Sequence, residues 1–205
     1  LGLYPVTGFA LAAGVRLYER ETQDAFAKPA PAPRGALFRY RAAGVNTLSP
    51  ASIRTTVASM IAAEPLPPLP RIEGTALDAL FAAYAPVYEI DTVSRDDRPG
   101  RPTRRDDSVP DVDAGTPVVY TRLAWTRFDG ALLPQLVYTV WFARRPPSRP
   151  GDPLAGRLDG LVWRVTLDRD GAPLLFDTIH PCGCYHQFVP TARLAAKAPE
   201  PGVEE

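Results

Sequence analysis

Residues 136–142, Leu-Val-Tyr-Thr-Val-Trp-Phe, are the stretch of this 205-residue chain that decides its fold. Nearly every position is apolar, and β-branched and aromatic side chains dominate, as in a strand that is buried on both faces. We therefore predict that residues 136–142 form a central strand and that the remaining elements are arranged around it.

The segment before this strand predicts a β-hairpin. Residues 118–128 have strand character and are followed by Asp129-Gly130, a pair that accepts the positive φ values of a type I′ turn. Pro134 has no backbone N–H, so it indicates an edge position or a bulge where the second strand of this hairpin begins.

A second hairpin is predicted after a loop that is rich in proline and glycine, residues 144–160. From Leu161 to Leu167 apolar and polar residues alternate, which is the pattern of a strand with one buried face. Asp168 to Gly171 suits a turn closed by glycine in the left-handed region, and residues 172–179 return as the partner strand.

Two helices and two short strands are predicted ahead of these hairpins. Ser49 as N-cap and Pro50 at the first helical position begin one helix that ends near Glu64, and a capping pattern at Thr75 begins another that ends before Pro86. Short strands are expected at residues 36–40 and 87–92. The apolar stripes of the helices are Ile53, Val57, Met60 and Ile61, and Leu77, Leu80, Phe81 and Tyr84.

These elements predict an α+β fold. We expect a mainly antiparallel sheet of about four to six strands, built from two consecutive hairpins and packed by two helices, in a single domain over residues 36–196. Residues 94–113 carry mixed charges without apolar periodicity and are predicted to be a long solvated loop. The acidic, proline-containing residues 197–205 are predicted to be a disordered tail.

The first 27 residues are predicted to form an N-terminal helical arm or the remnant of a membrane anchor, and residues 28–35 a Pro/Ala linker. An arm of this kind suggests contact with a protein partner or a membrane through residues 1–26. Membrane association or export follows only if an apolar segment precedes residue 1, so the compartment stays open.

Charge and motif content exclude several classes of function. Basic and acidic residues balance at 23 each, so no overall field attracts nucleic acid, which we do not expect as a partner. The sequence contains no Gly-rich phosphate loop, no Gly-x-Ser-x-Gly motif and no His-Glu-x-x-His pair. Reaction and small-molecule substrate are therefore not indicated.

Residues 180–186, His-Pro-Cys-Gly-Cys-Tyr-His, contain both cysteines and both histidines of the chain. In a straight strand, alternate side chains lie about 6.6 to 6.8 Å apart, too far for one ion to collect all four. Pro181 and Gly183 favour a curl, and a carboxylate from Asp159 or Asp177 is near in sequence. The leading hypothesis is a metal-binding protein or metalloenzyme with zinc, or else copper or iron. The predicted metal ligands are His180, Cys182, Cys184 and His186.

Three alternatives to metal binding stay open, two for residues 180–186 and one for the chain as a whole. Cys182 and Cys184 fit a thiol–disulfide redox protein if a bend at Gly183 brings them within disulfide range. The chain also fits a non-catalytic accessory or scaffold subunit that docks through its N-terminal arm. The cysteines and histidines can finally have only a structural role.

Overall fold

The computed structural model describes residues 28, 31–43, 48–62, 74–105, 108–152 and 155–195. The chain divides into two units, Leu1–Arg34 and Gly35–Glu205, and every element below belongs to the second unit. The predicted arm at residues 1–27 and the tail at residues 197–205 lie outside the described residues. No described helix is both long and apolar enough to cross a membrane.

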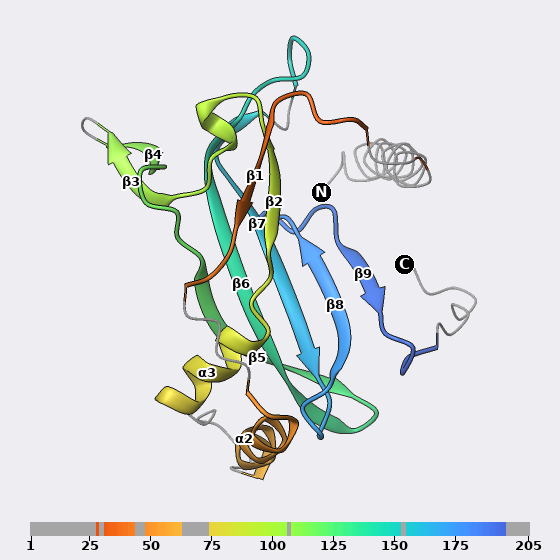
Figure 1. The fold of residues 1–205 in the computed structure, drawn as a ribbon. Helices are drawn as coiled ribbons and strands as arrows, with labels where there is room; N and C mark the ends of the chain where they lie inside the picture. The colour runs from red at the N-terminus through yellow and green to blue at the C-terminus, as the bar shows by residue number, and fades with distance from the viewer. Residues whose placement is uncertain are drawn as a thin grey trace, which may run out of the picture. The chain divides into compact units, whose positions relative to one another are not determined.

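The main sheet has five antiparallel strands whose order in space follows their order in the sequence (Figure 1). They are β5 (Tyr120–Phe128), β6 (Ala131–Arg145), β7 (Gly156–Leu167), β8 (Pro173–Ile179) and β9 (Gln187–Pro190). Residues 136–142 lie inside β6, which pairs with β5 on one side and with β7 on the other. Both predicted hairpins are present. Strands β6 and β7 are longer than the predicted residues 136–142 and 161–167, whereas β5 and β8 begin two residues and one residue later than predicted.

The turns of the two hairpins have the backbone angles that their residues predict. Asp129 and Gly130 have φ values of 47° and 70°, and Gly171 has a φ of 79°. A Cβ on Gly171 would lie 2.5 Å from Cγ2 of Ile53, so this turn also needs glycine because helix α2 approaches it closely. Pro134 pairs only with Trp125, because pairing with β7 begins at Gln135, so β6 has a neighbouring strand on one side only at this residue, in keeping with the predicted edge position.

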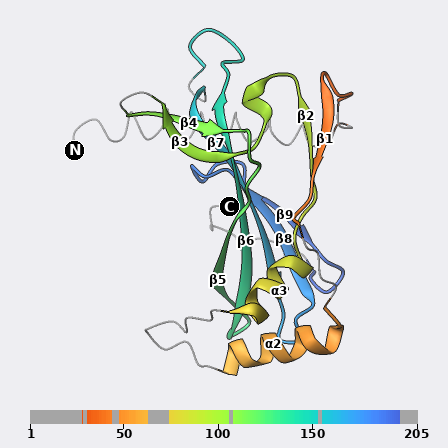
Figure 2. The same cartoon turned by 60° about the vertical axis from the view of Figure 1, so that its left-hand side comes forward.

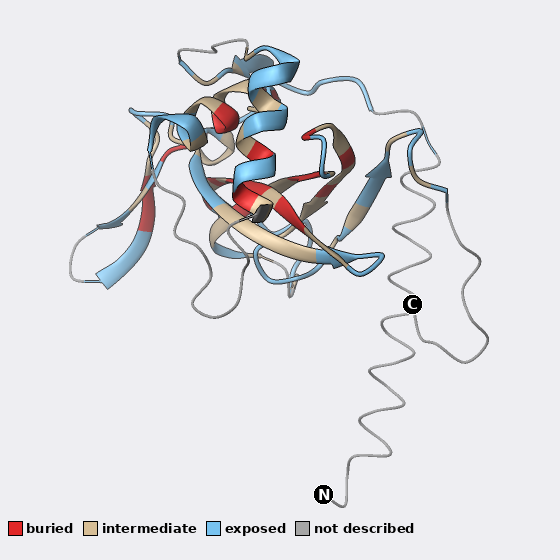
Figure 3. Ribbon diagram, turned by 90° about the horizontal axis from the view of Figure 1, so that it is seen from below, coloured by how far each residue is buried: buried red, intermediate tan, exposed pale blue. Residues whose placement is uncertain are grey.

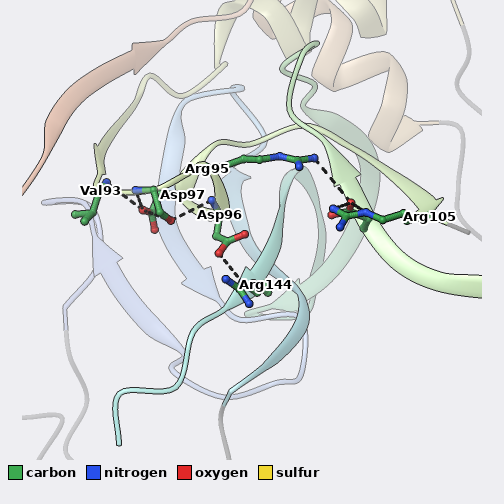
Figure 4. Close-up of polar contacts among 8 residues, drawn as sticks. Val93, Arg95, Asp96, Asp97, Arg105 and Arg144 are labelled. Atoms are coloured by element: carbon green, nitrogen blue, oxygen red, sulfur yellow. Dashed lines mark hydrogen bonds and ion pairs between the residues drawn. The ribbon is translucent and has the colours of Figure 1, made fainter.

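The prediction of one long charged loop at residues 94–113 is wrong. This segment contains a short 3₁₀ helix, η1 (Arg95–Asp97), and the hairpin strands β3 (Arg101–Arg105) and β4 (Val109–Asp113). Several of its described charged side chains form ion pairs (Figure 4). Asp96 Oδ2 accepts a 2.6 Å hydrogen bond from Arg144 Nε of β6, and buried Asp111 accepts one of 2.9 Å from Arg105 Nε.

The α+β fold class is also wrong, because the described residues are mostly β. They form nine strands in three sheets and only two α-helices, with 47% strand and 17% helix. Besides the main sheet there are two antiparallel pairs, β3 with β4 and β1 (Ala36–Tyr40) with β2 (Tyr88–Thr92). Strand content exceeds the prediction because residues 94–113 were expected to be a loop. The strands β3 and β4 in this segment carry cross-strand ion pairs, such as Arg101 with Asp113, and lack apolar alternation.

The core lies between one face of the main sheet and two helices, α2 (Pro50–Ala62) and α3 (Thr75–Ala83). Figures 1 and 2 show both helices at one end of the long strands, with the β3–β4 hairpin at the other end. The buried segments gather where helices and sheet meet (Figure 3). The core residues are Val57, Met60, Leu80, Phe81, Leu136, Tyr138, Val165 and Leu167.

Two tyrosine hydroxyls hold this interface in place. The buried Tyr138 of β6 donates a 2.8 Å hydrogen bond to the carbonyl of Phe81 in α3, and their rings meet edge to face with centroids 5.5 Å apart. Tyr84 donates a 2.6 Å hydrogen bond to the carbonyl of Gly171 in the β7–β8 turn. Each bond satisfies a polar group that would otherwise be costly to remove from water.

Replacing Leu136 with alanine should destabilise the domain by about 2 to 5 kcal/mol, because the side chain is fully buried and its loss leaves a cavity between helix and sheet. Chemical denaturation measures this difference. Leu37→Ala is the matched control, since Leu37 is 51% exposed and should cost about 0.5 kcal/mol or less. Equal losses for the two variants would contradict the core described above.

Candidate functional site: a Cys-x-Cys turn at the end of β8

The residues between β8 and β9 form a tight turn instead of a straight strand. The backbone N–H of His180 donates a 3.0 Å hydrogen bond to the carbonyl of Cys184, and that of Gly183 donates one of 2.8 Å to the carbonyl of His180. Gly183 has a φ of 92°, a conformation that favours glycine. Both cysteines in the turn are reduced and exposed.

Gly160 of β7 makes room for this turn. A Cβ at Gly160 would lie 2.8 Å from Cγ of Pro181 and 3.0 Å from the carbonyl oxygen of Val140. Only a residue without a side chain therefore lets Pro181 rest directly on the β7 backbone. The close contact places the start of the turn beside Asp159, the residue that precedes Gly160.

Strand register puts Asp159 and His180 on the same face of the sheet. Val162 of β7 pairs with Ile179 of β8, so extending this antiparallel register by one residue places His180 opposite Leu161. Side chains alternate between faces along a strand, and Asp159 is two residues from Leu161. The two side chains therefore meet on the face that also carries the helices.

Asp159, His180 and Cys182 form a continuous chain of polar contacts. The imidazole Nε2 of His180 is hydrogen-bonded to Oδ1 of Asp159, and its Nδ1 lies 2.8 Å from Sγ of Cys182. A carboxylate only accepts hydrogen bonds, so Nε2 carries the hydrogen and the neutral ring presents its Nδ1 lone pair to the thiol. This order of groups is that of an activated nucleophile: thiol, base, and carboxylate that orients the base.

The environment separates the proton affinities of the two thiols. A hydrogen bond from Cys184 is the largest factor that lowers the pKa of Cys182, to about 7, and the contact with His180 lowers it further. The same contact between the two sulfurs, together with burial, raises the pKa of Cys184. Burial opposes the charged form of His180, but the hydrogen bonds to Asp159 and Cys182 outweigh it and raise the pKa of that ring.

Two further side chains surround the turn. The ring of Tyr185 meets the His180 ring edge to face, with centroids 6.4 Å apart, and Arg145 Cζ lies 5.6 Å from the centroid of Tyr185.

A pocket of about 240 Å³ opens beside Asp159 between η1 and the end of β6. It is lined by Ile90, Asp96, Asp97, Phe142, Arg144, Arg145, Pro146 and Asp159.

The fourth predicted ligand, His186, does not join this cluster. Its Nε2 lies 3.0 Å from Oδ1 of Asp177 and 2.7 Å from Nη2 of Arg164. The structure thus brings His180, Cys182 and Cys184 to one turn and places His186 elsewhere. In the part of the chain that is described, no three His, Cys, Asp or Glu side chains converge in a way that could hold a metal ion.

Sequence reasoning noted Asp159 only as a nearby carboxylate and missed Arg145, Arg164 and Tyr185. The alternation in β7 carried a signal for Arg164, since this arginine occupies a strand position flanked by apolar residues. Comparison with known proteins adds no assignment: no protein-family model, no curated protein and no solved structure matches this chain.

Alkylation of Cys182 should rise with pH through a midpoint of about 7, because the lowered pKa makes the thiolate abundant below the ordinary range of a thiol. Cys184→Ala should shift the midpoint upward by the largest amount, and Asp159→Asn should shift it upward by less. Peptide mass spectrometry after pulses of iodoacetamide measures the rates. Asp170→Asn, on an exposed turn, is the control that should leave the midpoint unchanged.

Proposed function

We propose that this chain is a thiol–disulfide exchange protein in which Cys182 is the attacking thiolate and Cys184 is the resolving thiol. One observation carries the proposal: the contact chain from Asp159 through His180 to Cys182, with a second exposed thiol two residues further along the same turn. Reactive cysteines need a stabilised thiolate and solvent access, and Cys182 has both.

The reaction divides into two balanced steps. The proton of Cys182 passes to Nδ1 of His180, and the thiolate attacks one sulfur of a substrate disulfide, which gives a mixed disulfide and releases one substrate thiolate. Cys184 then loses its proton, attacks Sγ of Cys182 and releases the second substrate thiolate. Two electrons pass from the cysteine pair to the substrate, and the two thiolates take up the two protons.

The turn favours this direction of attack. Asp159 keeps the hydrogen of neutral His180 on Nε2, so the acceptor lone pair faces Cys182 and not Cys184. The higher pKa of Cys184 keeps this second sulfur protonated, and therefore unreactive, until the mixed disulfide has formed. The Cys-x-Cys ring is small, which makes the product disulfide strained and easy to reduce again.

The test is reaction of the reduced protein with a small neutral disulfide, hydroxyethyl disulfide, at pH 7. Wild-type protein should lose two hydrogens as an internal disulfide forms, whereas Cys184→Ala should stop at a stable mixed disulfide on Cys182. Cys182→Ala should react about tenfold more slowly, since the remaining thiol is mostly protonated. Intact-mass spectrometry follows each species.

His180→Gln supplies the matched control for the role of the base, because it keeps a polar side chain while it removes the proton acceptor. It should slow the first step and leave the fold unchanged by circular dichroism. Equal reactivity of Cys182 and Cys184, or wild-type protein that never forms the internal disulfide, would refute the proposal.

Metal binding is the second candidate, with His180, Cys182 and Cys184 as ligands and zinc as the first choice. The hydrogen bond from His180 Nε2 to Asp159 supports it, because metal-binding histidines commonly donate their other N–H to a carboxylate. The three donors sit on one turn but do not converge on a common point, so binding an ion would require their side chains to rearrange, and His186 is engaged with Asp177 and Arg164. An ion at this turn would therefore have three protein ligands and not the predicted four.

Elemental analysis of protein purified without chelators tests this candidate. Bound metal should be stoichiometric in the wild type, absent from the double variant Cys182→Ser/Cys184→Ser, and unchanged in His186→Gln. Metal loss in His186→Gln would favour the four-ligand arrangement instead. A metal-free wild type, with both thiols titratable, would remove metal binding and leave the exchange proposal intact.

A further inference from the structure

A second cluster of charged side chains lies on the other face of the main sheet. Arg164 of β7 pairs in register with Asp177 of β8, and Asp177 pairs with Phe188 of β9. Arg164 is three residues from Leu161 and therefore points to the face opposite Asp159 and His180. Neither described helix packs against this face, since the core residues of β6 and β7 belong to the alternate positions.

Asp177 holds this cluster together. Its carboxylate is 1% exposed, and Oδ1 accepts a 2.6 Å hydrogen bond from Nε of Arg164 and lies 3.0 Å from Nε2 of His186. A buried carboxylate without partners would be very costly, so Arg164 and His186 are fixed in place by it. Nη1 of Arg164 has no partner among the described residues, which leaves N–H donors of a three-quarters buried guanidinium unused.

A pocket of about 290 Å³ surrounds these groups. Apolar side chains form much of its wall, from Phe128, Leu174, Leu175, Phe188 and Leu194. Asp177 is the single acidic residue of the lining and is already paired. An apolar pocket with a few convergent polar groups is the usual form of a small-molecule site.

We propose that this pocket binds a small organic carboxylate whose apolar body lies against Leu175 and Phe188 and whose carboxylate meets Arg164. The one acidic group, Asp177, is already paired with Arg164 and His186, whereas Nη1 of Arg164 can still donate, so an anion fits better than an amine. The Nη1 group of Arg164 can donate charge-assisted hydrogen bonds to a carboxylate, and the apolar wall favours an attached ring or hydrocarbon group over an inorganic anion.

This site is independent of thiol–disulfide exchange. It uses His186, Arg164 and Asp177, none of which contacts Cys182 or Cys184, and it opens on the opposite face of β7 and β8. Binding can therefore be measured on reduced, oxidised or thiol-free protein, such as Cys182→Ser/Cys184→Ser, with the same expected result.

The experiment is an NMR titration of the ¹⁵N-labelled full chain with three probes of similar shape: benzoate, benzyl alcohol and benzylamine. Benzoate should perturb residues that line the pocket and the side-chain Nε–H of Arg164, with an affinity at least about tenfold above that of the other two probes. Inorganic phosphate is the fourth probe and should bind more weakly than benzoate.

Two variants test whether benzoate binds through the guanidinium of Arg164. Arg164→Lys keeps a cation beside Asp177 but removes the Nη1 donor group, and it should weaken benzoate binding by about tenfold. Arg122→Gln is the matched control, because Arg122 is exposed on the same face at a position outside the pocket. If Arg164→Lys does not fold, the comparison of the four probes on wild-type protein alone tests the proposal. Equal affinity for benzyl alcohol or phosphate, or perturbations away from the pocket, would overturn the proposal.

Discussion

The antiparallel register of β6, β7 and β8 is the constraint on which the rest of this structure depends. A shift of one residue would turn every side chain of a strand to the opposite face. Leu136 and Val165 would then leave the helices, and Arg164 would enter the core without Asp177. Because both errors are costly, burial on one face and an ion pair on the other specify the same pairing.

The two helices fix this register by more than apolar contact. Tyr138 and Tyr84 connect α3 and the segment after it to β6 and to the β7–β8 turn through backbone carbonyls. The turn at Gly171 in turn leaves space for Ile53 of α2. Helix position, turn conformation and strand pairing therefore depend on one another. Together they also fix the position of the thiol turn, which follows the far end of β8.

Much of the sheet and little of the site could be predicted from the sequence. The apolar run at residues 136–142 and the Asp129-Gly130 pair indicate strand and turn through local chemistry alone. The strands β3 and β4 escaped prediction because ion pairs such as Arg105 with Asp111 replace the apolar pattern. The separation of His186 from the cysteines was equally hidden, since the buried Asp177 that binds it was considered only as a metal ligand.

The position of β7 gives the molecule two chemically separate sides. Residues 159 and 164 belong to one strand, yet one orients the imidazole beside a thiol and the other presents a guanidinium to an apolar pocket. A disulfide on one side and an organic anion on the other would not compete for space. The shortest connection between the two sides is not the sheet but the chain itself, because Tyr185 alone separates Cys184 of the thiol turn from His186 of the pocket.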